Sequence, residues 1–239
     1  MATTEQDVKN WYNERHIRTK EKSWRIPEAY LLTLDYFKEA GIKPGQKILD
    51  IGFGSGYFLK AAADAGLETY GVDISEEGLK IAQQSSPSSK LVVGKGEALP
   101  FEDNFFDHVA CIGVLEHYLD IEKGIKEMKR VVKKGGTVLI MVPNSQFIYW
   151  KIMGMEGTEQ TEISENPMTL EEWKNKFTKE GFEVVKIDKD NWFAQEPIAF
   201  TPFSTSVILR GLKRSLFKLV WGFVPLKYTY QFVYILKKN

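Results

Sequence analysis

Cysteine is almost missing from this chain of 239 residues, in which Cys111 stands alone. A single thiol excludes an intramolecular disulfide and a metal cluster held by several thiolates, and it fits a reducing compartment. Long apolar runs are also missing. The uncharged stretch 197–209 has 13 residues and two prolines, and nothing in the chain reaches the ~20 apolar residues that span a bilayer. The polar start, MATTEQDVKNWYNERH, lacks the apolar segment of a signal peptide. We therefore expect a cytoplasmic protein without a transmembrane helix.

A surplus of charge is absent as well, because 32 basic residues balance 32 acidic ones. The balance argues against a protein that coats nucleic acid. The distribution is uneven, however. No acidic residue follows Glu196, whereas seven basic residues do, so the two parts carry −7 and +7. This asymmetry singles out the C-terminal segment as a candidate contact surface.

Apolar periodicity predicts alternating strands and helices. Strands are expected at 47–51, 68–73, 90–93, 107–113, 136–142, 183–188 and 228–237, and helices at 57–65, 76–84, 121–132 and 169–179. The last helix begins with a capping box of Thr169 and Glu172, and the KKGG at 133–136 is expected to end the helix before it. Such alternation predicts an α/β fold, a doubly wound, Rossmann-like sheet of seven mostly parallel strands with helices on both faces.

We expect one domain built of four segments. Residues 1–46 form a helical flap and a lead-in helix, and 47–190 form the core, with a loop-rich, acidic insert at 144–168 on the substrate side. Residues 191–227 form a basic amphipathic insert, and 228–239 complete the sheet. Glu159 and Gln160, within the first insert, are placed to contribute to substrate choice.

Glycines recur at alternate positions after the first predicted strand, in ILDIGFGSG at 48–56. Glycine permits positive φ and close approach of a ligand to the backbone. The spacing G-x-G-x-G differs from the G-x-G-x-x-G of dinucleotide sites, and a tight strand-to-helix turn would also explain it. Asp73 ends the second strand, where a carboxylate can accept hydrogen bonds from both hydroxyls of a ribose. Asp73 could instead cap the helix that follows, but Ser75 is better placed for that role.

Five ordered blocks resemble class I S-adenosylmethionine-dependent methyltransferases: ILDIGFGSG, GVDIS, GKGEALPFEDNFFDHV, CIGVLEH and VVKKGGTVLIMVPN, over 48–144. The resemblance implies S-adenosylmethionine as cofactor and a set of binding residues. Those for its methionine part are Asp50, Gly52, Gly54 and Gly56; those for the ribose are Asp73 and Ile74; those near the adenine are Gly96, Glu97 and Ala98; Ile112 or Gly113 closes the pocket. Tyr12, on the flap, is implied as a contact of the cofactor carboxylate, although Trp11 and Tyr12 could simply pack the flap onto the core.

One position departs from that family. Lys95 stands where related chains often have an aspartate that accepts a hydrogen bond from the adenine amino group, and lysine cannot accept one. Glu97 or the backbone near Gly96 is the expected substitute.

The predicted reaction is methyl transfer to an oxygen, nitrogen or carbon of a small-molecule, lipid-linked or glycan acceptor. His117, just past the fourth strand, is the candidate base, with orientation of a loop as its alternative role. His108 is expected at the surface, and no metal site is expected because no cluster has ligand spacing. A cofactor-binding module without catalysis and a nicotinamide oxidoreductase are the rival functions.

The C-terminal segment predicts an amphipathic helix. Leu209, Leu212 and Leu216 fall on one side, while Arg210, Arg214 and Lys218 form a row opposite. A helix covering the core would explain the apolar side. Basic residues beside Phe217 and Trp221 suit peripheral contact of residues 207–221 with an anionic membrane surface, or with an anionic, lipid-like acceptor.

Overall fold

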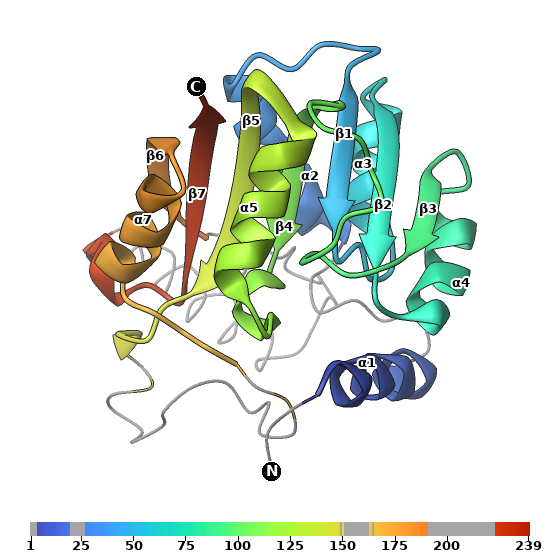
Figure 1. Ribbon diagram of the computed structural model, residues 1–239, viewed down its shortest axis with the longest axis horizontal. Helices are drawn as coiled ribbons and strands as arrows, with labels where there is room; N and C mark the ends of the chain where they lie inside the picture. Colours follow the sequence, from blue (N-terminus) through green and yellow to red (C-terminus); the bar gives the residue numbers. More distant parts are fainter. Residues whose placement is uncertain (1–3, 20–26, 149, 151–162, 164, 191–222) are drawn as a thin grey trace, which may run out of the picture.

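The computed structural model describes residues 4–19, 27–148, 150, 163, 165–190 and 223–239. Its centre is a seven-stranded sheet in the order β3-β2-β1-β4-β5-β7-β6 (Figure 1). The strands are β1 Lys47–Ile51, β2 Glu68–Asp73, β3 Lys90–Val93, β4 Phe106–Ile112, β5 Val132–Pro143, β6 Phe182–Lys189 and β7 Gln231–Lys238. Strands β1 to β5 pair in parallel, and β7 runs antiparallel to both of its neighbours. The predicted fold class is confirmed.

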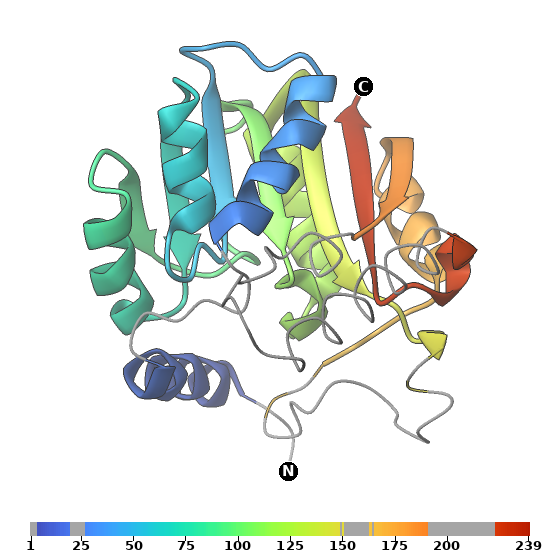
Figure 2. The same cartoon turned by 180° about the vertical axis from the view of Figure 1, so that it is seen from behind.

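Helices cover both faces of the sheet (Figures 1 and 2). Helices α2 (Pro27–Glu39) and α3 (Tyr57–Asp64) pack on one face, where Phe37 and Phe58 are buried, and α4 (Glu76–Ser85) packs beside α3. Helices α5 (Ile121–Val131) and α7 (Leu170–Lys179) cover the other face with Met128 and Trp173. The strand order changes direction between β1 and β4, and the carboxyl ends of the parallel strands lie at one edge of the sheet.

Helix α1 (Glu5–Thr19) lies across that carboxyl edge, below the sheet in Figure 1. Polar contacts tie it to the core. Lys9 pairs with Glu76 at 2.8 Å, and the Ser75 hydroxyl donates to Asn13 Oδ1 at 2.8 Å. The predicted N-terminal flap is therefore a helix held against the start of α4.

Strand β5 begins earlier than the sequence predicts. The KKGG segment at 133–136 is a bulge within β5, because Phe106 pairs with Val132 and His108 pairs next with Thr137. Gly135 adopts φ +73°, and Lys133 forms an ion pair with Asp107 at 2.7 Å. The predicted end of the helix is confirmed to within one residue, since α5 ends at Val131. The strand, however, starts at Val132 and not at residue 136, because the glycines let it loop out and rejoin β4.

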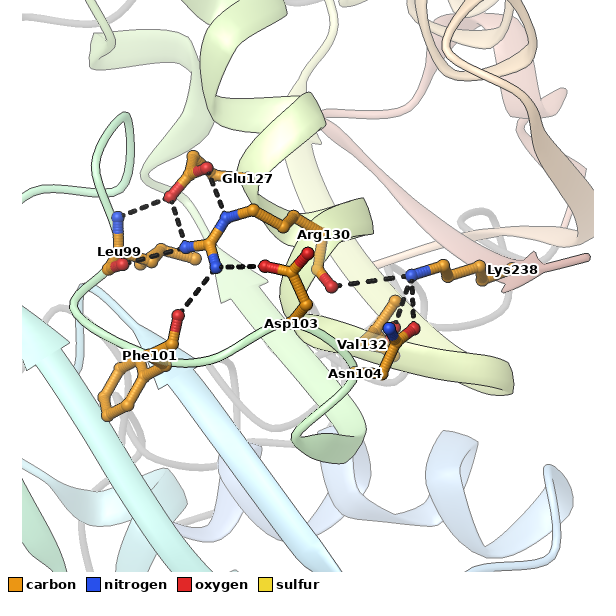
Figure 3. A network of polar contacts seen from close by, with 8 residues as sticks. All are labelled: Leu99, Phe101, Asp103, Asn104, Glu127, Arg130, Val132 and Lys238. Carbon is orange, nitrogen blue, oxygen red and sulfur yellow. Dashed lines mark hydrogen bonds and ion pairs between the residues drawn. The ribbon is translucent and has the colours of Figure 1, made fainter.

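A polar network fastens the loop after β3 to α5 (Figure 3). Arg130 donates to the carbonyls of Leu99 (2.9 Å) and Phe101 (2.7 Å), and it pairs with Glu127 and Asp103. Lys238 of β7 donates to Val132 O at 2.8 Å close by. The same loop includes residues 94–97, which lie at the carboxyl edge of the sheet. The network therefore holds this loop in place beside the strand ends.

Two further expectations have clear outcomes. The capping box of Thr169 and Glu172 is confirmed at the start of α7. His108 was expected at the surface, but this is wrong, because the residue is only 5% exposed. Its ring packs on Phe37, and its Nε2 lies 3.1 Å from Gln46 Oε1. The apolar face of α2 covers this position, which local sequence does not reveal.

The predicted basic helix around 208–220 and residues Glu159 and Gln160 lie outside the described residues. Within the parts that are described, no helix is both long and apolar enough to cross a membrane.

Candidate functional site

A cavity of about 910 Å³ opens at the carboxyl edge of the sheet, between the strand ends and α1. The flap, the turns after β1, β2, β3 and β4, and the segments beside β5 and β7 all line it. The structure brings most of the predicted site residues together in its wall: Tyr12, Asp50, Gly52, Gly54, Asp73, Ile74, Gly96, Glu97, Ile112 and His117. Gly56 and Ala98 are not part of the wall.

The glycine turn serves two purposes. Gly52, Gly54 and Gly56 have φ of +75°, +50° and +76°, a region that disfavours side chains. A Cβ on Gly56 would lie 2.9 Å from Ala82 of α4, so this glycine lets α3 and α4 pack. A Cβ on Gly54 would meet only His16 Cε1, at 3.9 Å. Gly54 thus lies next to His16 of the flap, and both residues line the cavity.

Asp73 locks the turn to the end of β2. Its buried carboxylate accepts hydrogen bonds from the Gly54 and Ser75 backbone N–H groups, both at 2.8 Å. Burial raises the pKa of Asp73, and these hydrogen bonds oppose the rise. Each carboxylate oxygen keeps a lone pair that can accept from a ligand hydroxyl. Ser75 caps α4 by accepting from Gly78, as predicted.

Asp50 is an acid without its full set of partners. It is 2% exposed, and its Oδ1 has no hydrogen-bond partner among the described residues. Burial, with the nearby Asp73 carboxylate, raises the pKa of Asp50 to about 8. A buried oxygen of this kind is costly unless a ligand satisfies it. Asp50 therefore suits a cationic ligand group placed next to the glycine turn.

The loop after β3 forms another part of the wall. Glu97 accepts a hydrogen bond from the Leu119 N–H at 3.1 Å, and Gly96 lies so close to Tyr118 that a Cβ would overlap the Tyr118 hydroxyl. Lys95, the departure from the family pattern, pairs with Glu5 of α1. Its side chain thus holds the flap, a role that the sequence did not indicate.

His117 lies in the 3₁₀ turn η1 (Leu115–His117) and is 6% exposed. Its ring meets that of Tyr12 edge to face, with centroids 6.1 Å apart. One donor atom each of Glu116, His117 and Glu165 lies within 4.8 Å of the others. Carboxylates there can orient the imidazole, and the three donors are of kinds that bind divalent cations. Glu165 belongs to the acidic insert that was expected on the substrate side, but 48 positions separate it from His117, so the sequence did not show that the two residues meet.

His16 of the flap covers the glycine turn. It is 5% exposed, and a Cβ on Gly78 would lie 3.1 Å from its Nε2. Burial, assisted by the neighbouring Arg15 charge, lowers the pKa of His16 to about 4. The imidazole is therefore neutral at pH 7 and packs as an uncharged cover over the turn.

Aromatic side chains form the cavity wall near β5 and β7. Phe147, Trp150 and Tyr230 have ring centroids 5.3 to 5.8 Å apart, and all three line the cavity. Asn144, fully buried, holds this wall together, because its side-chain amide donates to the carbonyls of Lys227 and Thr229 at 2.9 and 2.7 Å. Only the fold joins these segments, so sequence patterns gave no signal for the wall.

Residues 49–140 match the family model described as a methyltransferase domain. This part of the chain is similar to a methyltransferase domain. The resemblance read from the five blocks is confirmed, and the matched segment supplies the glycine turn, Asp73 and His117. The flap and the aromatic wall both lie outside it.

Curated relatives resemble about half of the chain, or less. A demethylmenaquinone methyltransferase of Renibacterium salmoninarum is 37% identical over 100 residues, which is 42% of this chain and 42% of that protein. The chain spans about half the length of the curated relatives it matches, or less. Their similarity therefore supports the domain, and leaves the acceptor to other arguments.

Solved structures share the fold along most of the chain. The cyclase SpnF has a TM-score of 0.69 and 17% identity, covering 100% of this chain and 98% of its own. Phosphoethanolamine N-methyltransferase 2 of Haemonchus contortus, solved with S-adenosyl-L-methionine, has a TM-score of 0.60 and 23% identity, covering 86% of this chain and 52% of its own. At such identities these neighbours show the fold alone, which also hosts a cyclase.

Proposed function

We propose that this chain transfers a methyl group from S-adenosylmethionine to a small, lipid-like acceptor. One observation carries the proposal. Asp50, Asp73 and the glycine turn all belong to the segment that matches the methyltransferase family model, and they meet in the wall of one large cavity. The residues fit the cofactor. Asp73 can accept from the ribose hydroxyls, and the unsatisfied Oδ1 of Asp50 suits the ammonium of its amino-acid end.

Bound S-adenosylmethionine supplies a methyl group activated by the sulfonium charge, so transfer depends mainly on alignment. The glycine turn and Asp73 orient the ligand, and α1 excludes water from the cavity. His117 is proposed as the base that accepts the acceptor proton on an imidazole nitrogen. Its contact with Tyr12 and its closeness to Glu116 and Glu165 support this role, since they fix the ring beside the cavity.

The acceptor is proposed to be a phenol or hydroquinone with an apolar substituent. Phe147, Trp150 and Tyr230 offer flat apolar surface against which an aromatic ring can pack. The name of the curated relatives, demethylmenaquinone methyltransferases, supports the same class, since that acceptor is a quinone with a lipid chain. An acceptor of this kind would reach the enzyme from a membrane, which accords with the predicted basic helix.

The test is an incubation with S-adenosylmethionine and a panel of reduced prenyl-naphthoquinones, simple phenols and primary amines, read by mass spectrometry. We expect a gain of one methyl group, ~14 Da, on the hydroquinones, together with formation of S-adenosylhomocysteine. The His117→Ala variant serves as the matched control with intact cofactor binding. Methylation of amines alone would overturn the acceptor class. Cofactor binding without turnover on any acceptor would favour the non-catalytic alternative.

A further inference from the structure

The order of the strands indicates where the base of the cofactor lies. The ends of β1, β2 and β3 are neighbours at the carboxyl edge of the sheet. In the proposed function, the cofactor ammonium meets Asp50 near the end of β1, and the ribose meets Asp73 at the end of β2. Neighbouring strands lie about 4.8 Å apart, so a ligand that continues along this row reaches the loop after β3. Residues 94–97 of that loop line the cavity. The adenine base is therefore expected beside them.

An ion pair joins this loop to the flap. Lys95 of the loop donates a hydrogen bond to the carboxylate of Glu5, the first residue of α1, and both residues line the cavity. The Lys95 side chain is 39% exposed and that of Glu5 is 54% exposed. A pair that is as accessible as this contributes little to stability. Its effect is to hold a carboxylate of the flap beside the loop after β3.

Glu5 can accept a second hydrogen bond. Lys95 contacts its Oε2, and a carboxylate has about four lone-pair sites on its two oxygens. Val8 follows three positions later on the same face of α1, is 7% exposed and also lines the cavity. The flap thus presents an acceptor and an apolar surface side by side. Adenine requires both, because it is a flat ring system with an amino group at one edge.

Glu97 is the residue that the sequence favoured for this contact. It lines the cavity too, but its Oε1 accepts a hydrogen bond from the Leu119 N–H at 3.1 Å. This bond ties Glu97 to the turn that follows β4. The lysine on the loop, in contrast, brings the carboxylate of Glu5 to the loop itself. The described contacts therefore favour Glu5.

We propose that Glu5 accepts a hydrogen bond from the 6-amino group of the cofactor's adenine, and that Lys95 is the positioning residue that holds Glu5 there. This inference rests on the proposed function. It adds a cofactor contact on the flap, outside the segment that matches the family model. Because Glu5 belongs to α1, binding of the base stabilises this helix in its position across the carboxyl edge.

Calorimetry with two ligands tests the assignment: S-adenosylhomocysteine and its purine analogue, in which hydrogen replaces the 6-amino group. The wild-type chain should bind S-adenosylhomocysteine about 10- to 150-fold more tightly, the range for losing a hydrogen bond to a charged acceptor. Glu5→Ala should bring the ratio of the two affinities close to one. Lys95→Gln should lower this ratio, and Lys95→Arg, which can still pair with Glu5, should retain it.

The matched control is Lys9→Gln. Lys9 joins α1 to Glu76 by an ion pair of 2.8 Å, and neither of these two residues lines the cavity. This variant loosens the flap in a similar way, so it can weaken both ligands, but it should leave the ratio of the two affinities at the wild-type value.

Four outcomes would overturn the assignment. A wild-type ratio close to one would exclude a contact with the amino group, and this needs no variant. A wild-type ratio that persists in Glu5→Ala and falls in Glu97→Gln would transfer the contact to Glu97. Equal loss of the ratio in Lys9→Gln and Glu5→Ala would make Glu5 a residue that only fastens the flap. An unchanged ratio in Lys95→Gln would remove the positioning role. Failure of the wild-type chain to bind either ligand would instead refute the proposed function, so the two failures are distinguishable.

Discussion

Asp50 should make the folded protein less stable as the pH rises from about 4 to 8. With its pKa raised to about 8 by burial, the carboxyl stays protonated in the folded chain at pH values where the unfolded chain, near the ordinary 3.8, is ionised. The unfolded state therefore binds fewer protons than the folded state between about pH 4 and pH 8. By linkage, the free energy of unfolding falls as pH rises through this range.

The magnitude follows from the size of that window. Each pH unit inside it lowers the stability of the folded state by about 1.4 kcal/mol, so the ligand-free protein loses about 4 kcal/mol between pH 5 and pH 8 through this group. Asp50→Asn removes the titration and keeps the shape. The variant should gain stability relative to wild type by about that amount over the same interval.

Urea unfolding at pH 5, 6.5 and 8 without cofactor measures the difference. The control is Asp64→Asn, which replaces an exposed carboxylate on α3 that pairs with Lys60. Parallel pH curves for the wild type and Asp50→Asn would refute the reasoning. A linked result is expected on binding: if the cofactor ammonium meets Asp50, binding at pH 7 should release close to one proton, seen by calorimetry in two buffers of different ionisation enthalpy.

Further predictions concern the ribose contact, the base, the loop network and the tail. Asp73→Ala should weaken cofactor binding by ~10–150-fold, and normal calorimetric affinity would contradict the ribose role. His117→Ala should lower turnover by ~10²–10⁴-fold at unchanged cofactor affinity; a rate left intact would make it structural. Arg130→Ala should cost about 2–3 kcal/mol in urea unfolding, against little for the exposed Lys126→Ala on the same helix; equal effects would discount the network. The 207–221 segment should bind anionic vesicles in a salt-sensitive way, with ~1 kcal/mol from each basic residue. A protein that sediments with neutral vesicles but not with anionic ones would contradict this.

Local sequence pattern predicted much of the fold. The bounds of β1, β2 and β3 agree with the prediction, because each is a short run of strand-forming residues that ends at a glycine or an aspartate. The start of α7 was also predicted correctly, from its capping box. The glycine turn and Asp73 were predicted for the same reason, because both lie at the ends of strands that the local pattern marks, and the structure places them in the cavity wall.

The bulge in β5 and the burial of His108 show where local pattern fails. Lysines followed by two glycines look like the end of a helix, yet pairing with β4 draws them into the strand. A histidine at the start of a strand looks exposed, yet α2 covers it. In both cases a partner far along the chain decides, and a short sequence window cannot contain it.

Local sequence was enough to predict the strand and helix types, the glycine turn and the resemblance to methyltransferases, since these depend on backbone geometry and spacing within a few residues. Only the folded structure shows that β7 lies between β5 and β6, that Glu165 lies close to His117, and that Phe147, Trp150 and Tyr230 form one wall of the cavity. Those contacts join segments tens to hundreds of residues apart. Their energies arise from burial and charge pairing, which come into being only when the chain has folded.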